Sequence, residues 1–556
     1  MAPTPGILYV TMAPLPSLTP AQMRDWYQNE HGPGRLRLPF IFTNGFRYRA
    51  TDSKSPEWMA IYDVTDMEYM TKEVYTRLRQ DPIQSQRERD TMKQIKVDRK
   101  FYDLVSSQES PEFLTLEEVK YEGAEGNVMV AVIVTLKDPA RKEEVVKWYE
   151  EEHIPMLSKV PGWRRSRIFV TSHVEPKSPE ETEYLTLHEY GPENGMGGQE
   201  FQDAINTPWR TEVFDKIIGE KRRRPYELYY TFGPAPRDLA SLSEPTAVPF
   251  QSEYHRTRSF PVQDGDGWAA IESYITTPDG VALPYKLEGS TDQQAPLIVL
   301  CNSILVEYGI WDSFIKSFFS VPDNRKYRIV RYMKRGRYSD CGETPVTVDL
   351  LAEDVIALLD ALRVPKAAAV IGVSLGGATS LNVALKFPDR VASFIACDTN
   401  SLAPPSNPKA WDERVEVAEK EGMTASSGEP IVGEQLAEVT VRRWFVKESY
   451  DDPVLAKEAE RVKSMVVKNS LEGFRKSVKA LYKYDFRDDM KNAKVKGAFV
   501  VGAGDGVLPK TMKEMRDGYG DGTAAFESIN NAGHLPMVEK PDNFAKVVTK
   551  FLGSGL

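Results

Sequence analysis

Residues 367–377 read Ala-Ala-Ala-Val-Ile-Gly-Val-Ser-Leu-Gly-Gly, an apolar run that leads into a G-x-S-x-G sequence. A helix-forming stretch follows at once, in residues 378–386. Small residues on both sides of Ser374 allow a sharp turn from strand to helix, which exposes the serine hydroxyl at the helix N-terminus. The stretch therefore predicts a nucleophilic serine on a strand–turn–helix unit, with a glycine-rich packing turn as the alternative.

A serine hydroxyl is a weak nucleophile unless a base removes its proton. His534 follows a strand expected at 524–529, and Asp505 follows one expected at 497–502. Their order along the chain, serine, then acid, then histidine, fits a base and the carboxylate that orients it. Asp398, after a strand expected at 391–397, is a second candidate for the acid. The plainer alternatives are a packed loop histidine and a turn aspartate.

An acyl-transfer site also needs two backbone N–H groups that stabilise the negative oxygen of the intermediate. Leu375, directly after the serine, is expected to supply one of them. The loop after the apolar run 296–302 is expected to supply the other, from Ile304 or alternatively from Ser303. Simple strand termination is the structural alternative for that loop.

Strand-like and helix-like runs alternate from about residue 263, which favours a mostly parallel α/β sheet over 263–556. A charged, helix-rich insertion at about 400–485 is expected to form a lid over this sheet. The predicted strands are 296–302, 327–332, 367–372, 391–397, 497–502 and 524–529.

Seven short stretches in this half follow the order of one known family. They are Asn302–Leu305, Gly309–Asp312, Gly372–Gly377, Ile395–Thr399, Trp411–Arg414, Arg443–Phe445 and Gly533–Pro536. In these stretches the chain resembles the 3-oxoadipate enol-lactonase branch of the α/β-hydrolases. The resemblance implies hydrolysis of a lactone or related ester, with Ser374, Asp505 and His534 as the catalytic triad.

The same resemblance implies that Trp444, Arg414 and Trp311 contact the substrate. Two departures from the family pattern, a leucine at position 305 and the loop Arg335–Ser339, indicate a different and larger acyl group. Cleavage of a carbon–carbon bond or of a thioester by the same triad is the alternative reaction.

The N-terminal half contains an internal repeat. Residues 26–33 read Trp-Tyr-Gln-Asn-Glu-His-Gly-Pro, and residues 148–155 read Trp-Tyr-Glu-Glu-Glu-His-Ile-Pro, an offset of 122 positions. The flanking runs of both copies predict the order β-α-β-β-α-β of ferredoxin-like domains. We expect one such domain at 1–115 and another at 116–233, followed by a Pro- and Ser-rich linker at 234–262.

The repeated motif resembles the EthD-like branch of the dimeric α/β-barrel proteins, which implies a tandem pseudo-dimer within one chain. His31 and His153 are the repeated titratable residues, and a histidine near neutral pKa can transfer a proton. One hypothesis is a bifunctional enzyme whose N-terminal barrel isomerises or decarboxylates the substrate. The alternatives are histidines that only cap or pack their helices, and a repeat that serves only for docking.

Composition limits the classes of partner. The 556 residues carry a net charge of −10 and are 41% hydrophobic, which argues against a nucleic-acid or membrane binder and for a small-molecule substrate. Three cysteines, no secretory signal and no long apolar segment favour a cytoplasmic protein. No metal-binding or cofactor motif appears in the sequence, so we expect neither a metal nor a cofactor. A homo-oligomer is left open.

Overall fold

The computed structural model describes residues 2–116, 118–119, 124, 126–262 and 267–553. Contacts divide the chain into two compact units. The N-terminal unit contains the residues up to Pro236 together with Ser252–His255, and the C-terminal unit contains the rest. The domain boundary expected at residue 263 lies outside the described residues.

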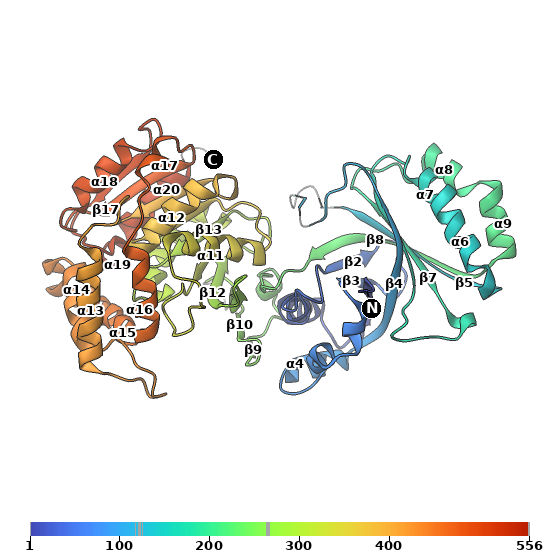
Figure 1. Ribbon diagram of the computed structural model, residues 1–556, viewed down its shortest axis with the longest axis horizontal. Coiled ribbons are helices and arrows are strands. Elements are labelled where there is room, and N and C mark those ends of the chain that lie inside the picture. Colours follow the sequence, from blue (N-terminus) through green and yellow to red (C-terminus); the bar gives the residue numbers. More distant parts are fainter. Residues whose placement is uncertain (1, 117, 120–123, 125, 263–266, 554–556) are drawn as a thin grey trace. The chain divides into compact units, whose positions relative to one another are not determined.

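Among the described residues of the N-terminal unit, eight strands form a closed barrel in the order β1-β3-β2-β8-β5-β7-β6-β4 (Figure 1). The first half of the unit contributes β4-β1-β3-β2 and the second half contributes β8-β5-β7-β6, joined at β2–β8 and β4–β6. The strands are β1 (Gly6–Pro14), β2 (Phe46–Ala50), β3 (Trp58–Val64), β4 (Ile95–Glu109), β5 (Val128–Leu136), β6 (Trp163–Thr171), β7 (Tyr184–Tyr190) and β8 (Ile218–Thr231).

The repeated motif forms the same local structure in both halves. Tyr27–His31 (η1) and Tyr149–His153 (η5) are each one π-helical turn between two α-helical segments. Wider turns of this kind occur frequently at functional sites. The helices of this unit are α1 (Pro20–Trp26), α2 (Gly32–Leu36), α3 (Glu73–Thr76), α4 (Gln86–Met92), α6 (Lys142–Trp148), α7 (Ile154–Leu157), α8 (Gln199–Ile205) and α9 (Pro208–Lys216).

In the described part of the C-terminal unit, ten strands form one sheet in the order β18-β17-β16-β15-β13-β14-β12-β11-β10-β9. The strands from β13 to β18 pair in parallel, and the core strands β13 to β16 are buried along their whole length, as strands covered on both faces are. These six strands are β13 (Leu297–Cys301), β14 (Arg328–Tyr332), β15 (Ala369–Val373), β16 (Ser393–Cys397), β17 (Lys496–Gly502) and β18 (Ala525–Ile529), each close to its predicted position.

The antiparallel end of this sheet differs from the sequence expectation. It consists of β9 (Phe250–Ser252), β10 (Thr257–Phe260), β11 (Ala270–Thr276) and β12 (Ala282–Gly289). The expected linker 234–262 thus supplies two strands, and β10 pairs with β11. In β10 the buried positions are Thr257 and Ser259, so the alternation that marks a half-buried strand is carried by small polar residues.

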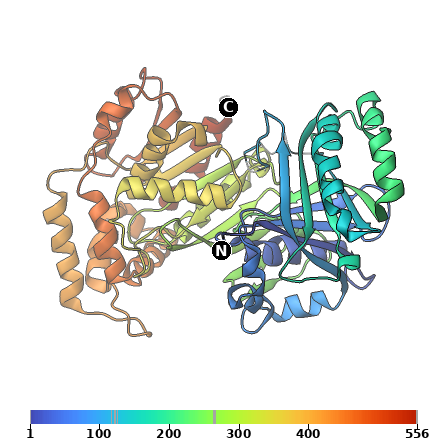
Figure 2. The ribbon, with the colours of Figure 1, turned by 45° about the vertical axis from the view of Figure 1, so that its right-hand side comes forward.

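The helices of the C-terminal unit fall into two groups. Those around the sheet include α10 (Asp312–Phe319), α11 (Val348–Ala361), α12 (Leu375–Lys386), α17 (Arg487–Lys491), α18 (Leu508–Asp517), α19 (Pro536–Glu539) and α20 (Pro541–Gly553). A second group gathers at one end of the unit (Figure 1; orange in Figure 2) and occupies the predicted lid. It contains α13 (Asn407–Glu421), α14 (Glu434–Trp444), α15 (Pro453–Val467) and α16 (Leu471–Ser477). Among the described helices, none combines the length and the apolar character that crossing a bilayer requires.

Candidate active site

Ser374 stands at the turn between β15 and α12. Its φ of 58° and ψ of −119° are strained for a residue with a side chain. The backbone holds the turn, because the Ser374 N–H donates to the Cys397 carbonyl at 2.9 Å. This is the strand–turn–helix geometry that the sequence predicted for a reactive serine.

The glycines around the serine are required by close backbone contacts. A Cβ on Gly372 would lie 1.9 Å from the Gly376 carbonyl oxygen, and one on Gly376 would lie 2.1 Å from the Cys301 carbonyl oxygen. Any side chain at these positions would push the start of α12 away from β13 and β15. The G-x-S-x-G-G spacing is therefore a packing requirement of the turn.

His534 and Asp505 lie together. The His534 Nδ1 atom is 2.6 Å from the Asp505 Oδ2 atom. The His534 backbone N–H donates to the Trp444 carbonyl at 2.7 Å, and the Trp444 indole stacks on the imidazole with ring centroids 5.7 Å apart. Ser374, Asp505 and His534 follow the parallel strands β15, β17 and β18 of one sheet, whose carboxyl ends share one edge of the sheet.

Asp398, the alternative acid, is also at this edge. It follows β16, is fully buried, and accepts a hydrogen bond from the Gly502 N–H at 2.9 Å. Three side chains at this edge, Asp398, Asp505 and His534, each place one possible ligand atom within 4.8 Å of the others. These three residues could therefore also hold a metal ion. Burial, and then the Asp505 charge, raise the pKa of Asp398 well above its usual value. Of the two carboxyl groups, Asp505 contacts the imidazole.

The loop after β13 is rigidly held. Asn302 Nδ2 donates to the Tyr332 carbonyl at 2.8 Å, and Trp311 Nε1 donates to Asn302 Oδ1 at 2.8 Å. Trp311 is fully buried, so its observed contact supports this loop. Ser303 is buried and its hydroxyl has no hydrogen-bond partner among the described residues, as a group that awaits a ligand would be. Ile304 is 1% exposed.

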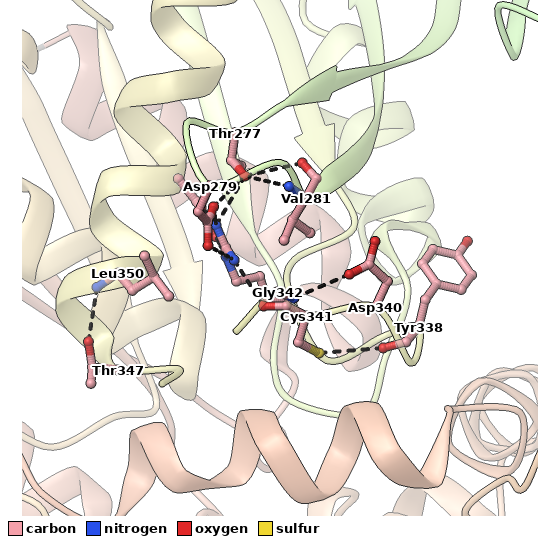
Figure 3. A network of polar contacts seen from close by, with 11 residues as sticks. Thr277, Asp279, Val281, Tyr338, Asp340, Cys341, Gly342, Thr347 and Leu350 are labelled. Carbon is pink, nitrogen blue, oxygen red and sulfur yellow. Dashed lines mark hydrogen bonds and ion pairs between the residues drawn. The ribbon is translucent and has the colours of Figure 1, made fainter. Parts of the chain in front are cut away.

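The sequence departures near this loop have structural explanations. Leu305 has a φ of 68°, in the left-handed region that glycine adopts at lower cost. Arg335 donates to Asp354 at 2.8 Å and to Asp279 at 2.7 Å, and Figure 3 shows Asp279 beside Thr277 and the turn at Gly342. Arg337 donates to the Met465 carbonyl and to Glu307. The 335–339 loop is thus anchored to both the sheet and the lid.

Of the arginines on the lid helices, Arg414 and Arg443 are partly shielded from water. Arg414 on α13 stacks over Trp411, with its guanidinium carbon 4.3 Å from the ring centroid. Burial, and then the Arg443 charge, lower the pKa of Arg414 to about 10. Loss of hydration lowers the pKa of Arg443 on α14, which the Asp505 charge opposes. In the part of the chain that the structure describes, no carboxylate forms an ion pair with either arginine. Sequence reasoning named Arg414 but missed Arg443, although Arg443 adjoins Trp444 in a family stretch.

The two repeated histidines lie in separate halves of the barrel. His31 is buried beside Trp26 and Tyr27, and its Nδ1 atom is 3.0 Å from Glu88 Oε1. His153 stacks on Trp148, and its Nδ1 atom is 3.1 Å from the Ala204 carbonyl oxygen. Burial lowers the pKa of both imidazoles to about 4. Each histidine is therefore held by residues of its own half of the barrel.

Comparison with known proteins agrees with the geometry of the C-terminal unit. The family described as alpha/beta hydrolase fold matches residues 334–541. The chain is 28% identical over 281 residues to 3-oxoadipate enol-lactonase 2 of Acinetobacter baylyi, covering 49% of this chain and 93% of that protein. It is 29% identical to enol-lactonase 1 of the same organism, covering 50% of this chain and 96% of that protein. Both alignments span about half of this chain.

Among solved structures, the enol-lactonase from Burkholderia xenovorans is 25% identical, covers 50% of this chain and 99% of its own, and has a TM-score of 0.43. The family match over residues 334–541 assigns the α/β-hydrolase fold to the C-terminal unit. Its similar proteins include enol-lactonases and esterases, so the chain is a hydrolase of this fold.

Proposed function

We propose that the C-terminal unit hydrolyses a lactone or a related ester of a small organic acid, through an acyl-enzyme on Ser374. The observation that carries the proposal is the 2.6 Å contact between His534 and Asp505, on the strand edge where the strained serine turn ends β15. The names of the similar enol-lactonases support the choice of a lactone.

In the first step, His534 Nε2 takes the Ser374 hydroxyl proton while Oγ attacks the substrate carbonyl carbon. Asp505 accepts the Nδ1–H hydrogen bond, which fixes the tautomer that leaves Nε2 free and stabilises the imidazolium. The Leu375 N–H and an N–H from Ile304 or Ser303 stabilise the oxyanion. The bond to the leaving oxygen then breaks, and His534 returns the proton to that oxygen.

In the second step, water attacks the acyl-enzyme. His534 removes one proton from the water, the oxyanion forms again, and the Ser374 oxygen leaves with the proton from His534. For a lactone, the two steps open the ring and yield one hydroxy or keto acid.

The lid indicates a substrate with a negative charge. Arg414 and Arg443 repel one another and have no carboxylate ion pair among the described residues, so an anion between them would lower the electrostatic energy. A carboxylate on the substrate supplies that charge, and guanidinium groups bind it in a bidentate manner. The substrate class is therefore a carboxylate-bearing lactone or ester.

Replacement of the nucleophile tests the reaction. Ser374→Ala is expected to lower kcat by about 10⁶-fold, measured on carboxylate-bearing lactones, while the thermal melting curve stays close to that of the natural protein. Hydrolysis in ¹⁸O-water should place the label in the new carboxylate. Undiminished hydrolysis by Ser374→Ala would contradict the proposal, and an unlabelled carboxylate would exclude attack by water on the acyl-enzyme.

The two neighbouring carboxyl groups offer a matched pair of variants. Asp505→Asn is expected to lower kcat by about 10⁴-fold, because no carboxylate then fixes the tautomer of His534 or stabilises its imidazolium. Asp398→Asn is expected to lose less than about tenfold, since the amide keeps the shape of the side chain and the oxygen that accepts from the Gly502 N–H, while Asp505 keeps its contact with the imidazole. A larger loss in Asp398→Asn than in Asp505→Asn would assign the catalytic charge to Asp398, and equal losses would contradict the sole assignment to Asp505.

We infer that the N-terminal unit is a tandem ferredoxin-like pseudo-dimer of EthD-like repeats. The matching strand orders of its two halves and the two π-helical turns at the same motif support this inference. Whether the unit catalyses a step or only docks is tested by His31→Ala and His153→Ala in the full chain, assayed on the lactone and on its hydrolysis product. Unchanged turnover in both variants would favour the docking role.

A further inference from the structure

A cavity of about 310 Å³ opens in the second half of the N-terminal unit. It lies between the strands β5, β7 and β8 and the helices of this half. Its walls are mainly apolar and aromatic, and they include Val132, Trp148, Tyr149 and Phe214. The volume is at the lower end of the range of small-molecule sites, and flat aromatic walls favour a flat ligand.

The cations of β8 divide between the two faces of the strand, because side chains alternate along it. Arg222 pairs with Glu183, and Arg224 pairs with Asp52 at 2.6 Å. Lys221 and Arg223, on the other face, line the cavity instead. The sequence shows 221–224 only as one basic run, and the structure separates its paired cations from the two that line the cavity.

A third cation, Arg210 of α9, completes this group, which we call the cavity cations: Arg210, Lys221 and Arg223. No ion pair joins any of them to a described carboxylate. Burial lowers the pKa of Lys221, and the charges of Arg210 and Arg223 lower it further. Three mutually repelling cations at an apolar cavity carry an electrostatic cost that a bound anion would relieve.

Two histidines line the same cavity. His153 and His188 lie with ring centroids 6.0 Å apart. Because the His153 Nδ1 atom faces a carbonyl oxygen, it must carry the proton, which leaves Nε2 as an acceptor. His188 is held by the Ser166 hydroxyl, 2.8 Å from its Nδ1 atom. His188 stands on the same face of β7 as Tyr190, which also lines the cavity.

We propose that this cavity binds a small aromatic carboxylate, with the ring against Trp148 and Phe214 and the carboxylate at the cavity cations. The first half of the unit does not offer the same site, because its interior is filled by Phe232, Tyr62 and Arg47. The site is separate from Ser374 and does not depend on the hydrolase proposal.

The test uses 2-naphthoate and its uncharged counterpart 2-naphthamide, titrated into the full-length protein by calorimetry and by quenching of tryptophan fluorescence. We expect saturable binding of one 2-naphthoate at the barrel, and at least about tenfold weaker binding of the amide. Absence of saturable 2-naphthoate binding, or equal affinity for the two compounds, would overturn the proposal.

Matched variants locate the site. Arg223→Gln and Lys221→Gln are each expected to weaken 2-naphthoate binding by about fivefold or more, while Arg222→Gln, a neighbour on the opposite face of β8, changes it by less than about twofold. Binding at the lid arginines of the hydrolase would respond to Arg414→Gln instead. Loss in Arg414→Gln with no loss in Arg223→Gln would overturn the proposal, and melting curves confirm that each variant is folded.

His188→Tyr provides a test that does not depend on charge. By strand register, His188 opposite Val130 corresponds to Tyr62 opposite Leu8, so the substitution gives the second half the side chain of the first. A larger ring in the cavity is expected to abolish 2-naphthoate binding with little change in hydrolase activity. Unchanged 2-naphthoate affinity in this variant would place the ligand elsewhere.

Discussion

The two halves of the N-terminal barrel share a motif but differ in what surrounds it. In the first half, the π-helical turn packs into a filled interior: the Tyr62 hydroxyl donates to the Tyr27 hydroxyl at 3.3 Å, and Tyr62 stacks on Phe232 with ring centroids 5.8 Å apart. In the second half, the corresponding turn borders the cavity of about 310 Å³. The motif therefore sets the backbone of the turn, and distant residues decide whether a site exists beside it.

The two halves of the barrel also differ in the partners of their charged groups. His31 faces the carboxylate of Glu88, and Arg47 is buried over the rings of Tyr27 and Trp58, 4.8 Å and 4.2 Å from their centroids. His153 faces only a backbone carbonyl, and the cavity cations have no described carboxylate as an ion-pair partner. The histidine of the first half thus faces a carboxylate, whereas in the second half a bound anion would supply the negative charge that the cavity cations lack among the described residues.

The largest contrast is expected from removal of one phenylalanine in each half. Phe232→Ala should cost about 3–5 kcal/mol of unfolding free energy, because it empties a fully buried position. Phe214→Ala should cost about 1–2 kcal/mol, because the ring is half-buried at a cavity that already exists. Urea unfolding of the full chain measures both. Equal costs would mean that the two interiors are packed alike.

Acid should destabilise the N-terminal unit. Burial lowers the pKa of His31, His153 and His255 to about 4. Burial also lowers the pKa of His188, to well below its usual value. Below about pH 6.5 these histidines bind protons in the unfolded chain but not in the folded unit, so the stability of the unit falls as the pH drops from about 6.5 toward 4. Glu30, with its pKa raised to about 7 by burial, and His173, with its pKa raised chiefly by Asp103, oppose this trend.

The measurement is urea unfolding of the full chain at pH 7 and pH 5, following the transition that Phe232→Ala shifts. Its midpoint is expected to be lower at pH 5, because four lowered histidines outweigh two opposing groups. The variant His31→Gln should reduce the pH dependence. A midpoint that rises on acidification would contradict the stated protonation of the buried histidines.

The smallest contrast concerns single hydroxyl groups. Tyr62→Phe is expected to cost about 0.5–1.5 kcal/mol, since the Tyr27 hydroxyl loses a buried hydrogen-bond partner. Tyr190→Phe, at the cavity, is expected to cost less than about 0.5 kcal/mol. Differential scanning calorimetry resolves changes of this size. A larger cost for Tyr190→Phe would indicate that the Tyr190 hydroxyl forms a hydrogen bond that stabilises the second half.

Sequence reasoning located the parallel strands and the serine turn because both depend on local patterns. Buried parallel strands read as continuous apolar runs, and the strand–turn–helix unit of Ser374 is encoded within about a dozen residues. The antiparallel strands β9 and β10 were missed because Thr257 and Ser259 carry no apolar alternation. Arg443 and His188 were missed because neither lies in a motif that specifies its neighbours in space.

By itself, the sequence determined where the parallel strands run, that a serine, an acid and a histidine follow strands of one sheet, and that one motif occurs twice. The tertiary structure alone decided that Asp505 rather than Asp398 contacts the imidazole, and that only Lys221 and Arg223 of their basic run line the cavity. The reason is physical: backbone preference and apolar periodicity act over a few residues, whereas hydrogen bonding, burial and charge pairing depend on side chains that approach from distant parts of the chain.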